Sequence, residues 1–199
     1  METQTAVAQK RQSTSSADHE SIRVNSPMTT SLSLLRNRNK ALVLGDVSLI
    51  QSKYLLESAN FSNVTVVDAN QALFDEEVIP ISDDRLERVQ MEFQHYEFPL
   101  SLFDFIYGKT IANTPKDIAQ TIMSKIERSL TFHGIFCAVW ASKGDTFRPI
   151  HYSKPQLVHL YEENGFKIIA LRELPLQPVK GGKTNYGVRH EIVVIATKQ

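Results

Sequence analysis

The chain has 199 residues, 42% of them apolar, and its 22 basic side chains are balanced by 22 acidic ones. That length suits one domain with its own core plus a short appendage. A formal net charge of zero argues against a nucleic-acid binder that works by broad phosphate neutralisation. No stretch approaches the roughly 20 apolar residues that a membrane span needs. We therefore expect neither nucleic acid nor a membrane as a partner.

The single cysteine, Cys137, excludes an internal disulfide and any cysteine-based zinc cluster. It lies inside an apolar run, which indicates a small core residue rather than a nucleophile. The first 30 residues lack the apolar core of a secretory signal peptide. These features predict a soluble, cytoplasmic protein.

Residues 1–36 differ in composition from the rest of the chain. They are rich in Ser, Thr, Gln and Asn and contain no aromatic residue and no glycine. Such a segment buries too little surface to offset the entropy of ordering it. We expect a flexible polar tail over 1–36, with 32–35 as its first contact with a folded domain over 37–199. A targeting or docking role for the tail is the alternative.

The first half of the domain alternates short apolar runs with helical spacing. The run that begins at residue 40 ends in Gly45, and a β-branched run ends in Asp68, as expected of buried parallel strands. The predicted elements are strands over 40–45, 63–68, 88–94 and 103–107 and a helix over 48–58.

The second half carries clear helix boundaries. Thr114 is placed to cap a helix whose first turn contains Pro115. Ser153 and Gln156 form a capping-box pattern, and that helix is expected to stop at Asn164–Gly165. The predicted elements are helices over 115–130 and 153–164 and strands over 135–140, 166–171 and 191–196. Strands that alternate with helices predict an α/β protein with a parallel sheet covered on both faces.

Ligands of open α/β sheets bind at the carboxyl ends of the strands. Gly45 is the only glycine before Gly108, so neither G-x-G-x-x-G nor a P-loop stands at the first turn, which disfavours NAD-type dinucleotides and nucleoside triphosphates. One glycine still permits a tight turn into a helix, whose N–H groups can bind a carboxylate. An acid such as Asp68 can accept both hydroxyls of a ribose. Together these groups describe S-adenosylmethionine (SAM).

The chain from residue 40 to 199 resembles the class I SAM-dependent methyltransferases. Residues 41–48 are similar to their first motif, 66–68 to the second and 103–108 to the fourth. Residues 130–136 stand where the family has a glycine-containing turn. The resemblance implies a three-layer Rossmann-like sheet, mostly parallel with an antiparallel last strand, and methyl transfer from SAM. The neutral charge of the chain favours a small-molecule acceptor over nucleic acid.

Three positions depart from the first motif. Val43 replaces an acid that in the family commonly bonds the amino group of SAM, and Val47 and Leu49 replace the second and third glycines. Asp46 is the residue that can take over the amino-group contact. Two interpretations stay open: an active methyltransferase, and a catalytically inactive protein of the same fold that serves as a binding or regulatory module.

The resemblance also assigns roles to residues at the strand ends. Asp68 holds the ribose or caps the next helix, and Tyr107 is a candidate for the group that faces the transferred methyl. Trp140 lines an acceptor pocket or closes the edge of the core. The expected cofactor residues are Gly45, Asp46, Asp68, Gln94, His95, Tyr96, Tyr107 and Gly108, and the expected acceptor residues are Lys109, Trp140 and Lys143.

The remaining histidines do not suggest further chemistry. His151 and His159 are eight residues apart, which is not a metal spacing on one helical turn, so no metal site is predicted. His133 is expected in a turn at the opposite end of the sheet from the strand ends, and we interpret it as structural.

Overall fold

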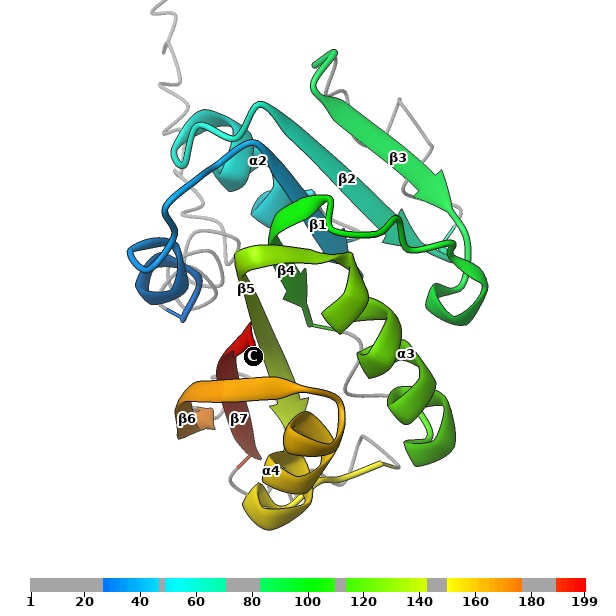
Figure 1. Cartoon of the computed structure of the whole chain (residues 1–199), viewed down its shortest axis with the longest axis vertical. Helices are drawn as coiled ribbons and strands as arrows, with labels where there is room; N and C mark the ends of the chain where they lie inside the picture. The colour runs from blue at the N-terminus through cyan, green and yellow to red at the C-terminus, as the bar shows by residue number, and fades with distance from the viewer. Residues whose placement is uncertain (1–26, 47–48, 71–82, 110–113, 143–149, 177–188) are drawn as a thin grey trace, which may run out of the picture.

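Figure 1 shows the computed structural model of the chain, which describes residues 27–46, 49–70, 83–109, 114–142, 150–176 and 189–199. Its centre is a seven-stranded sheet with the strand order β3-β2-β1-β4-β5-β7-β6. The strands are β1 (Lys40–Leu44), β2 (Asn63–Asp68), β3 (Leu86–Gln90), β4 (Phe103–Gly108), β5 (Leu130–Ala141), β6 (Phe166–Leu176) and β7 (Arg189–Lys198).

The first five strands form the parallel part of the sheet. β1 pairs in parallel with β2 on one side and β4 on the other, and β3 and β5 extend the sheet outward. β7 lies between β5 and β6 and is antiparallel to both. The predicted sheet, mostly parallel with an antiparallel last strand, is confirmed.

Helices cover both faces of the sheet (Figure 1). α3 (Lys116–Ser129) and α4 (Lys154–Glu163) pack on one face, and α2 (Ile50–Glu57) packs on the other together with a helical segment over 27–32. Because alternate side chains of a strand point to opposite faces, Leu42 faces α3 and α4, and Val43 faces α2. Burial on both faces explains why the central strands read as continuous apolar runs.

The helix boundaries confirm one predicted cap and correct another. The Ser153 hydroxyl accepts from the Gln156 N–H while the Gln156 side chain accepts from the Ser153 N–H, so the capping box is present. Thr114 does not cap α3: Pro115 is the N-cap, and no side chain bonds there. Pro115 is still extended, with φ −51° and ψ 150°, so the helix begins one residue later than the pattern indicates.

Other boundaries also differ from those predicted, for example β5, which begins at Leu130 rather than 135, and β6, which extends to Leu176 rather than 171. β3 covers 86–90 rather than 88–94, because it pairs residue by residue with β2, and that ladder ends where Asp68 meets Gln90. Packing also begins before residue 37, since Met28 and Leu32 are buried against the α2 face. Residues 1–26 of the predicted tail lie outside the described residues. Within the described chain, no helix is long and apolar enough to cross a membrane.

Candidate functional site

The carboxyl ends of three strands meet at the point where the strand order reverses. Leu44 at the end of β1 pairs with Val67 of β2 and with Gly108 of β4. Gly45 follows in a left-handed conformation, with φ 83°, and its N–H donates to the Val67 carbonyl at 3.0 Å. The structure therefore places Gly45, Asp68 and Gly108 side by side at the switch point, where ligands of this architecture bind.

Asp46 closes the turn that follows Gly45. Its Oδ2 accepts from the backbone N–H of Ser52 at 2.8 Å and from the Ser52 hydroxyl at 2.7 Å. Its Oδ1 has no hydrogen-bond partner among the described residues, and Asp46 is only 2% exposed. Burial raises the pKa of this carboxyl, and the bonds from Ser52 oppose that effect only in part. Asp46 is thus a buried acid with one oxygen satisfied and one available.

Leu49 adopts a backbone conformation that favours glycine. Its φ is 53° and its ψ 16°, and it serves as the N-cap of α2 without a side-chain bond. A left-handed conformation costs a residue with a Cβ roughly 1–2 kcal/mol. The Leu49 side chain is fully buried in the core on the α2 face, and that burial offsets the strain. Leu49 therefore holds a positive φ, which a glycine adopts without strain.

Asp68 ends β2 beside this turn and is mostly buried. Its Oδ1 accepts from the N–H of Asn70 at 2.8 Å. Residues 71–82 lie outside the described chain, so the choice between a ribose contact and a helix cap for Asp68 stays a prediction.

Met91 is a neighbour of Asp68 that the sequence analysis missed. Its N–H donates to the Asp68 carbonyl at 3.0 Å, and its side chain is 38% exposed. An exposed apolar side chain at the carboxyl edge can pack on a ligand ring. The position of Met91 directly after a strand would have indicated it, but the third strand was predicted to run to residue 94 and so to include it.

Tyr107 and Lys109 come from β4. The Tyr107 ring is buried on the α2 face, and burial raises the pKa of its phenol well above its ordinary value. Lys109 is half-buried just after the strand, and its positive charge acts on the Asp46 carboxyl. Beside Tyr107, burial raises the pKa of the Cys137 thiol to about 12, which agrees with a core role for that residue.

The three predicted adenine-site residues follow the end of β3. Gln94 and His95 are in the 3₁₀ turn η2 (Phe93–His95), which packs against α3, where Lys125 Nζ donates to the Gln94 carbonyl at 2.8 Å. Tyr96 lines a hollow with Lys40 at the amino edge of the sheet. The chain turns back after β3 to reach the start of β4, and this return carries Tyr96 away from the carboxyl edge.

Trp140 lies in the core rather than on an accessible surface. It is fully buried, its Nε1 donates to the Tyr161 hydroxyl at 3.1 Å, and its ring packs edge-on against Tyr152. Of the two alternatives for Trp140, the structure supports closure of the core. Lys143 lies outside the described residues.

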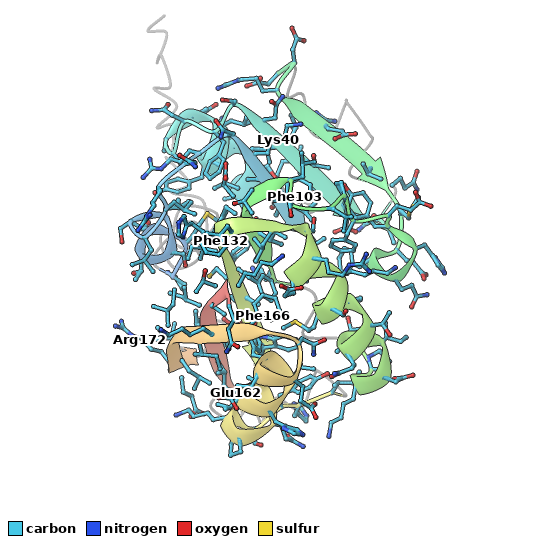
Figure 2. The ribbon with its side chains drawn as sticks, in the orientation of Figure 1. Lys40, Phe103, Phe132, Glu162, Phe166 and Arg172 are labelled. Carbon is cyan, nitrogen blue, oxygen red and sulfur yellow. The ribbon has the colours of Figure 1, made fainter. Side chains whose placement is uncertain are left out.

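The amino edge holds a separate group of side chains. Figure 2 labels Lys40, Phe103 and Phe132, which stand at or near the starts of β1, β4 and β5. His133 packs edge-on against Phe132, and Arg36 Nη1 donates to its Nε2 at 3.2 Å. His133 is therefore remote from the strand ends that form the candidate site, as predicted, but it lies within β5 rather than in a turn, because that strand begins at Leu130.

Comparison with known proteins shows the fold. No protein-family model matches the sequence, and no curated protein matches it. Several solved structures are similar. A putative S-adenosylmethionine-dependent methyltransferase from Listeria monocytogenes superposes with a TM-score of 0.69 at 13% identity, over 88% of this chain and 99% of that one.

Two further structures are similar over most of both chains. The N-methyltransferase NodS from Bradyrhizobium japonicum has a TM-score of 0.69 at 13% identity, over 92% of this chain and 98% of its own. The 1,6-didemethyltoxoflavin-N1-methyltransferase from Burkholderia thailandensis, solved with S-adenosylhomocysteine, has a TM-score of 0.63 at 17% identity, over 92% and 83%. The chain has the class I methyltransferase fold.

Proposed function

We propose that this chain is a SAM-dependent methyltransferase that acts on a small-molecule acceptor. The observation that carries the proposal is the presence of two buried acids, Asp46 and Asp68, at the carboxyl ends of the adjacent strands β1 and β2 in a class I methyltransferase fold. Both lie where the strand order reverses, which is the ligand position of open α/β sheets.

The residues at this edge fit the chemistry of SAM. The methionine part carries an ammonium group, and the buried Oδ1 of Asp46 is an acceptor without a donor in the part of the chain that the structure describes. The ribose carries two hydroxyls, and a carboxylate such as Asp68 can accept from both. Gly45 places no side chain directly after β1, beside β2. Met91 offers apolar surface next to Asp68 for the base.

Methyl transfer from this cofactor depends mainly on alignment. When bound, SAM supplies a methyl group on a positively charged sulfur; an acceptor lone pair forms the new bond as the carbon–sulfur bond breaks and its electrons stay on sulfur. Holding the two reactants in the right geometry can by itself account for a large part of the reduction in the activation barrier. Tyr107 is buried in the core on the α2 face, and burial raises its pKa, so the phenol stays protonated and we assign it no acid–base step.

A small acceptor is the preferred substrate class. The balanced charge of the chain offers no broad basic surface for nucleic acid. Among the structural neighbours, the Burkholderia thailandensis enzyme was solved with 1,6-didemethyltoxoflavin bound. These observations favour a small organic acceptor.

The proposal is tested by equilibrium binding of S-adenosylhomocysteine to Asp68→Asn and to a matched control. Asp84→Asn makes the same change at an exposed acid in the turn before β3. We expect Asp68→Asn to weaken binding at least about tenfold, which corresponds to about 1.4 kcal/mol, while Asp84→Asn binds as the unaltered chain does. Equal affinities in both variants would remove Asp68 from the site.

A non-catalytic binding module is the second candidate. The observation that favours it is the altered turn: Leu49 replaces a glycine, and Asp46 already occupies the Ser52 N–H at the start of α2. This candidate predicts no saturable binding of S-adenosylhomocysteine at millimolar concentration. Binding in the micromolar range with one site per chain excludes it as the sole function.

A further inference from the structure

A small hollow lies at the amino edge of the sheet, the edge opposite to the candidate site. Its volume is about 180 Å³, whereas sites for small-molecule ligands measure roughly 300–1,000 Å³. A hollow of this size fits a group as large as one side chain. It is lined by the segment that precedes β1 and by the starts of β4 and β5, through Leu35, Asn37, Asp104, Thr131, Phe132 and His133.

Asp104 is the acid of this hollow, and it is only 4% exposed. Its Oδ2 accepts from the backbone N–H of Asn39 at 2.8 Å, and its Oδ1 accepts from the Thr131 hydroxyl at 3.1 Å. A carboxylate offers about four acceptor positions, so each oxygen can accept a further donor. None of the ion pairs between described residues includes Asp104. Because a buried charge without a counter-charge is unfavourable, this carboxylate favours a cationic group that enters the hollow.

Phe132 is the most exposed member of the hollow. Its side chain is 74% exposed, more than any other large apolar side chain in the described part of the chain. Figure 2 shows it at the start of β5, and its ring packs edge-on against His133 with 4.6 Å between the ring centroids. Leu34, the neighbour in sequence of the lining residue Leu35, is 44% exposed. Exposed apolar surface of this kind is typical of a contact with another protein.

We propose that this hollow binds an arginine side chain of a partner protein. The guanidinium group donates to Asp104, and its apolar stem packs on the Phe132 ring, whose face also attracts the cation. Arginine fits better than a compact ammonium group, because its planar group presents five donors and is more weakly hydrated. A protein is favoured over a free organic cation, because Phe132 and Leu34 offer apolar surface to the residues that flank the arginine.

Arg36 carries a positive charge beside the hollow. Its Nη1 donates to His133 Nε2 at 3.2 Å, so that ring nitrogen is the acceptor. The contacts between described residues include none between Arg36 and Asp104, and the hollow is therefore not filled by the chain's own arginine. The charge of Arg36 repels an incoming arginine and attracts an acid. A change at Arg36 thus distinguishes a basic partner from an acidic one.

The experiment follows the backbone amide signals of the isotope-labelled full chain by nuclear magnetic resonance during titration with blocked tripeptides. The probe has arginine between two leucines, and two analogues carry glutamine or glutamate in place of the arginine. We expect the arginine peptide to cause saturable shifts at Thr131, Phe132 and His133, with a dissociation constant of about 1 mM, and the glutamine analogue to bind at least about fivefold more weakly. No shifts at these amides with ~10 mM peptide, equal affinity for arginine and glutamine, or a preference for glutamate would overturn the proposal.

Phe132→Ser and Leu174→Ser test the apolar contact. Leu174 is the control, because it is 38% exposed and lies at the other end of the sheet, where it pairs with Glu191 opposite Ala141 at the end of β5. We expect Phe132→Ser to weaken the arginine peptide at least about threefold and Leu174→Ser to leave its affinity unchanged. Equal affinities in the two variants would show that the ring does not contact the peptide, which contradicts the proposal.

Two further variants test the charges. Asp104→Asn is expected to reduce the preference for arginine over glutamine to less than about twofold. Arg36→Gln removes the like charge, so it is expected to strengthen the arginine peptide about twofold. Weaker binding after Arg36→Gln would show that this surface selects an acid and would overturn the proposal. If Asp104→Asn does not fold, the exposed position Arg36 still decides the sign of the charge that the hollow prefers.

The inference does not rest on the proposed function, because the hollow and the candidate cofactor site lie at opposite edges of the sheet. If S-adenosylhomocysteine binds and the arginine peptide does not, the inference is wrong and the proposed function stands. Self-association of the full chain that Phe132→Ser abolishes, without binding of the peptide, would assign the ring to a contact with a second copy and would likewise overturn the inference.

Discussion

Asp46 and Ser52 join the end of β1 to the first turn of α2 through two hydrogen bonds on one oxygen, at 2.8 Å from the Ser52 N–H and 2.7 Å from its hydroxyl. Both residues are buried. The pair holds the turn in which Leu49 keeps a positive φ. A side-chain contact thus links the end of β1 to α2 in a chain that has a single glycine there.

Ser52→Ala is expected to destabilise the chain by about 1–2 kcal/mol. The hydroxyl donates to a buried carboxylate, and hydrogen bonds to charged groups contribute roughly 1.5–3 kcal/mol, part of which the remaining N–H bond preserves. Urea unfolding measures the change. Ser124→Ala, an exposed serine on α3, is the control and should lie within about 0.5 kcal/mol of the original chain. Equal effects at Ser52 and Ser124 would contradict the account.

The stability difference between the original chain and Asp46→Asn is expected to fall as pH rises. The folded-state pKa of Asp46 is raised above its ordinary value of 3.8, so the folded state binds the proton more tightly than the unfolded state. The contribution of Asp46 is therefore fully present below pH 3.8 and is lost as pH rises through the folded-state pKa. Urea unfolding of both proteins from pH 3.5 to 7 tests the direction of this pH dependence. The other acids are the same in both proteins, so their contributions cancel in the difference. A difference that grows with pH would be inconsistent with a raised pKa.

Tyr161→Phe is expected to cost about 1–3 kcal/mol of stability, because it leaves the buried Trp140 Nε1 without an acceptor. The single tryptophan also reports unfolding by fluorescence. Tyr54→Phe serves as the control, since the Tyr54 hydroxyl lies 3.3 Å from Thr29 Oγ1 in an exposed contact. We expect that control to change stability by less than about 0.5 kcal/mol. If the two variants behave alike, the Trp140 bond does not stabilise the core.

Cys137 is expected to resist thiol reagents in the folded chain. Its thiol is buried with a pKa of about 12, so at pH 8 it is protonated and shielded. Modification by a chromogenic disulfide should be on the order of 100-fold slower than in concentrated urea, because it requires the chain to open. One thiol per chain should react after unfolding. Modification of the folded chain at the unfolded rate would show that β5 is accessible.

The class of fold could be predicted from sequence because the signals are local. The apolar runs that end at Gly45 and Asp68 are buried on both faces, and the capping box at Ser153 needs only four residues to form. The left-handed exit at Gly165, with φ 77°, is equally local. Such features depend on neighbours in the chain, and these neighbours are visible in the sequence.

Features that depend on distant partners were predicted less well. The end of β3 is set by its pairing with β2, and Tyr96 is carried to the amino edge by the return of the chain to β4. Trp140 finds its acceptor, Tyr161, 21 residues away on α4. The roles of Asp46 in the site also depend on the contact with Ser52, which no motif indicates. Sequence therefore located the edge of the sheet that holds the candidate site better than it identified the side chains there.

Isothermal titration calorimetry of the full chain with S-adenosylhomocysteine tests the central proposal most directly. The account predicts one site per chain and a dissociation constant in the micromolar range, with the ligand raising the thermal midpoint as expected for binding to the folded state. No heat and no thermal stabilisation at millimolar ligand would contradict it. That result would leave the class I methyltransferase fold in place and assign the chain a role other than methyl transfer.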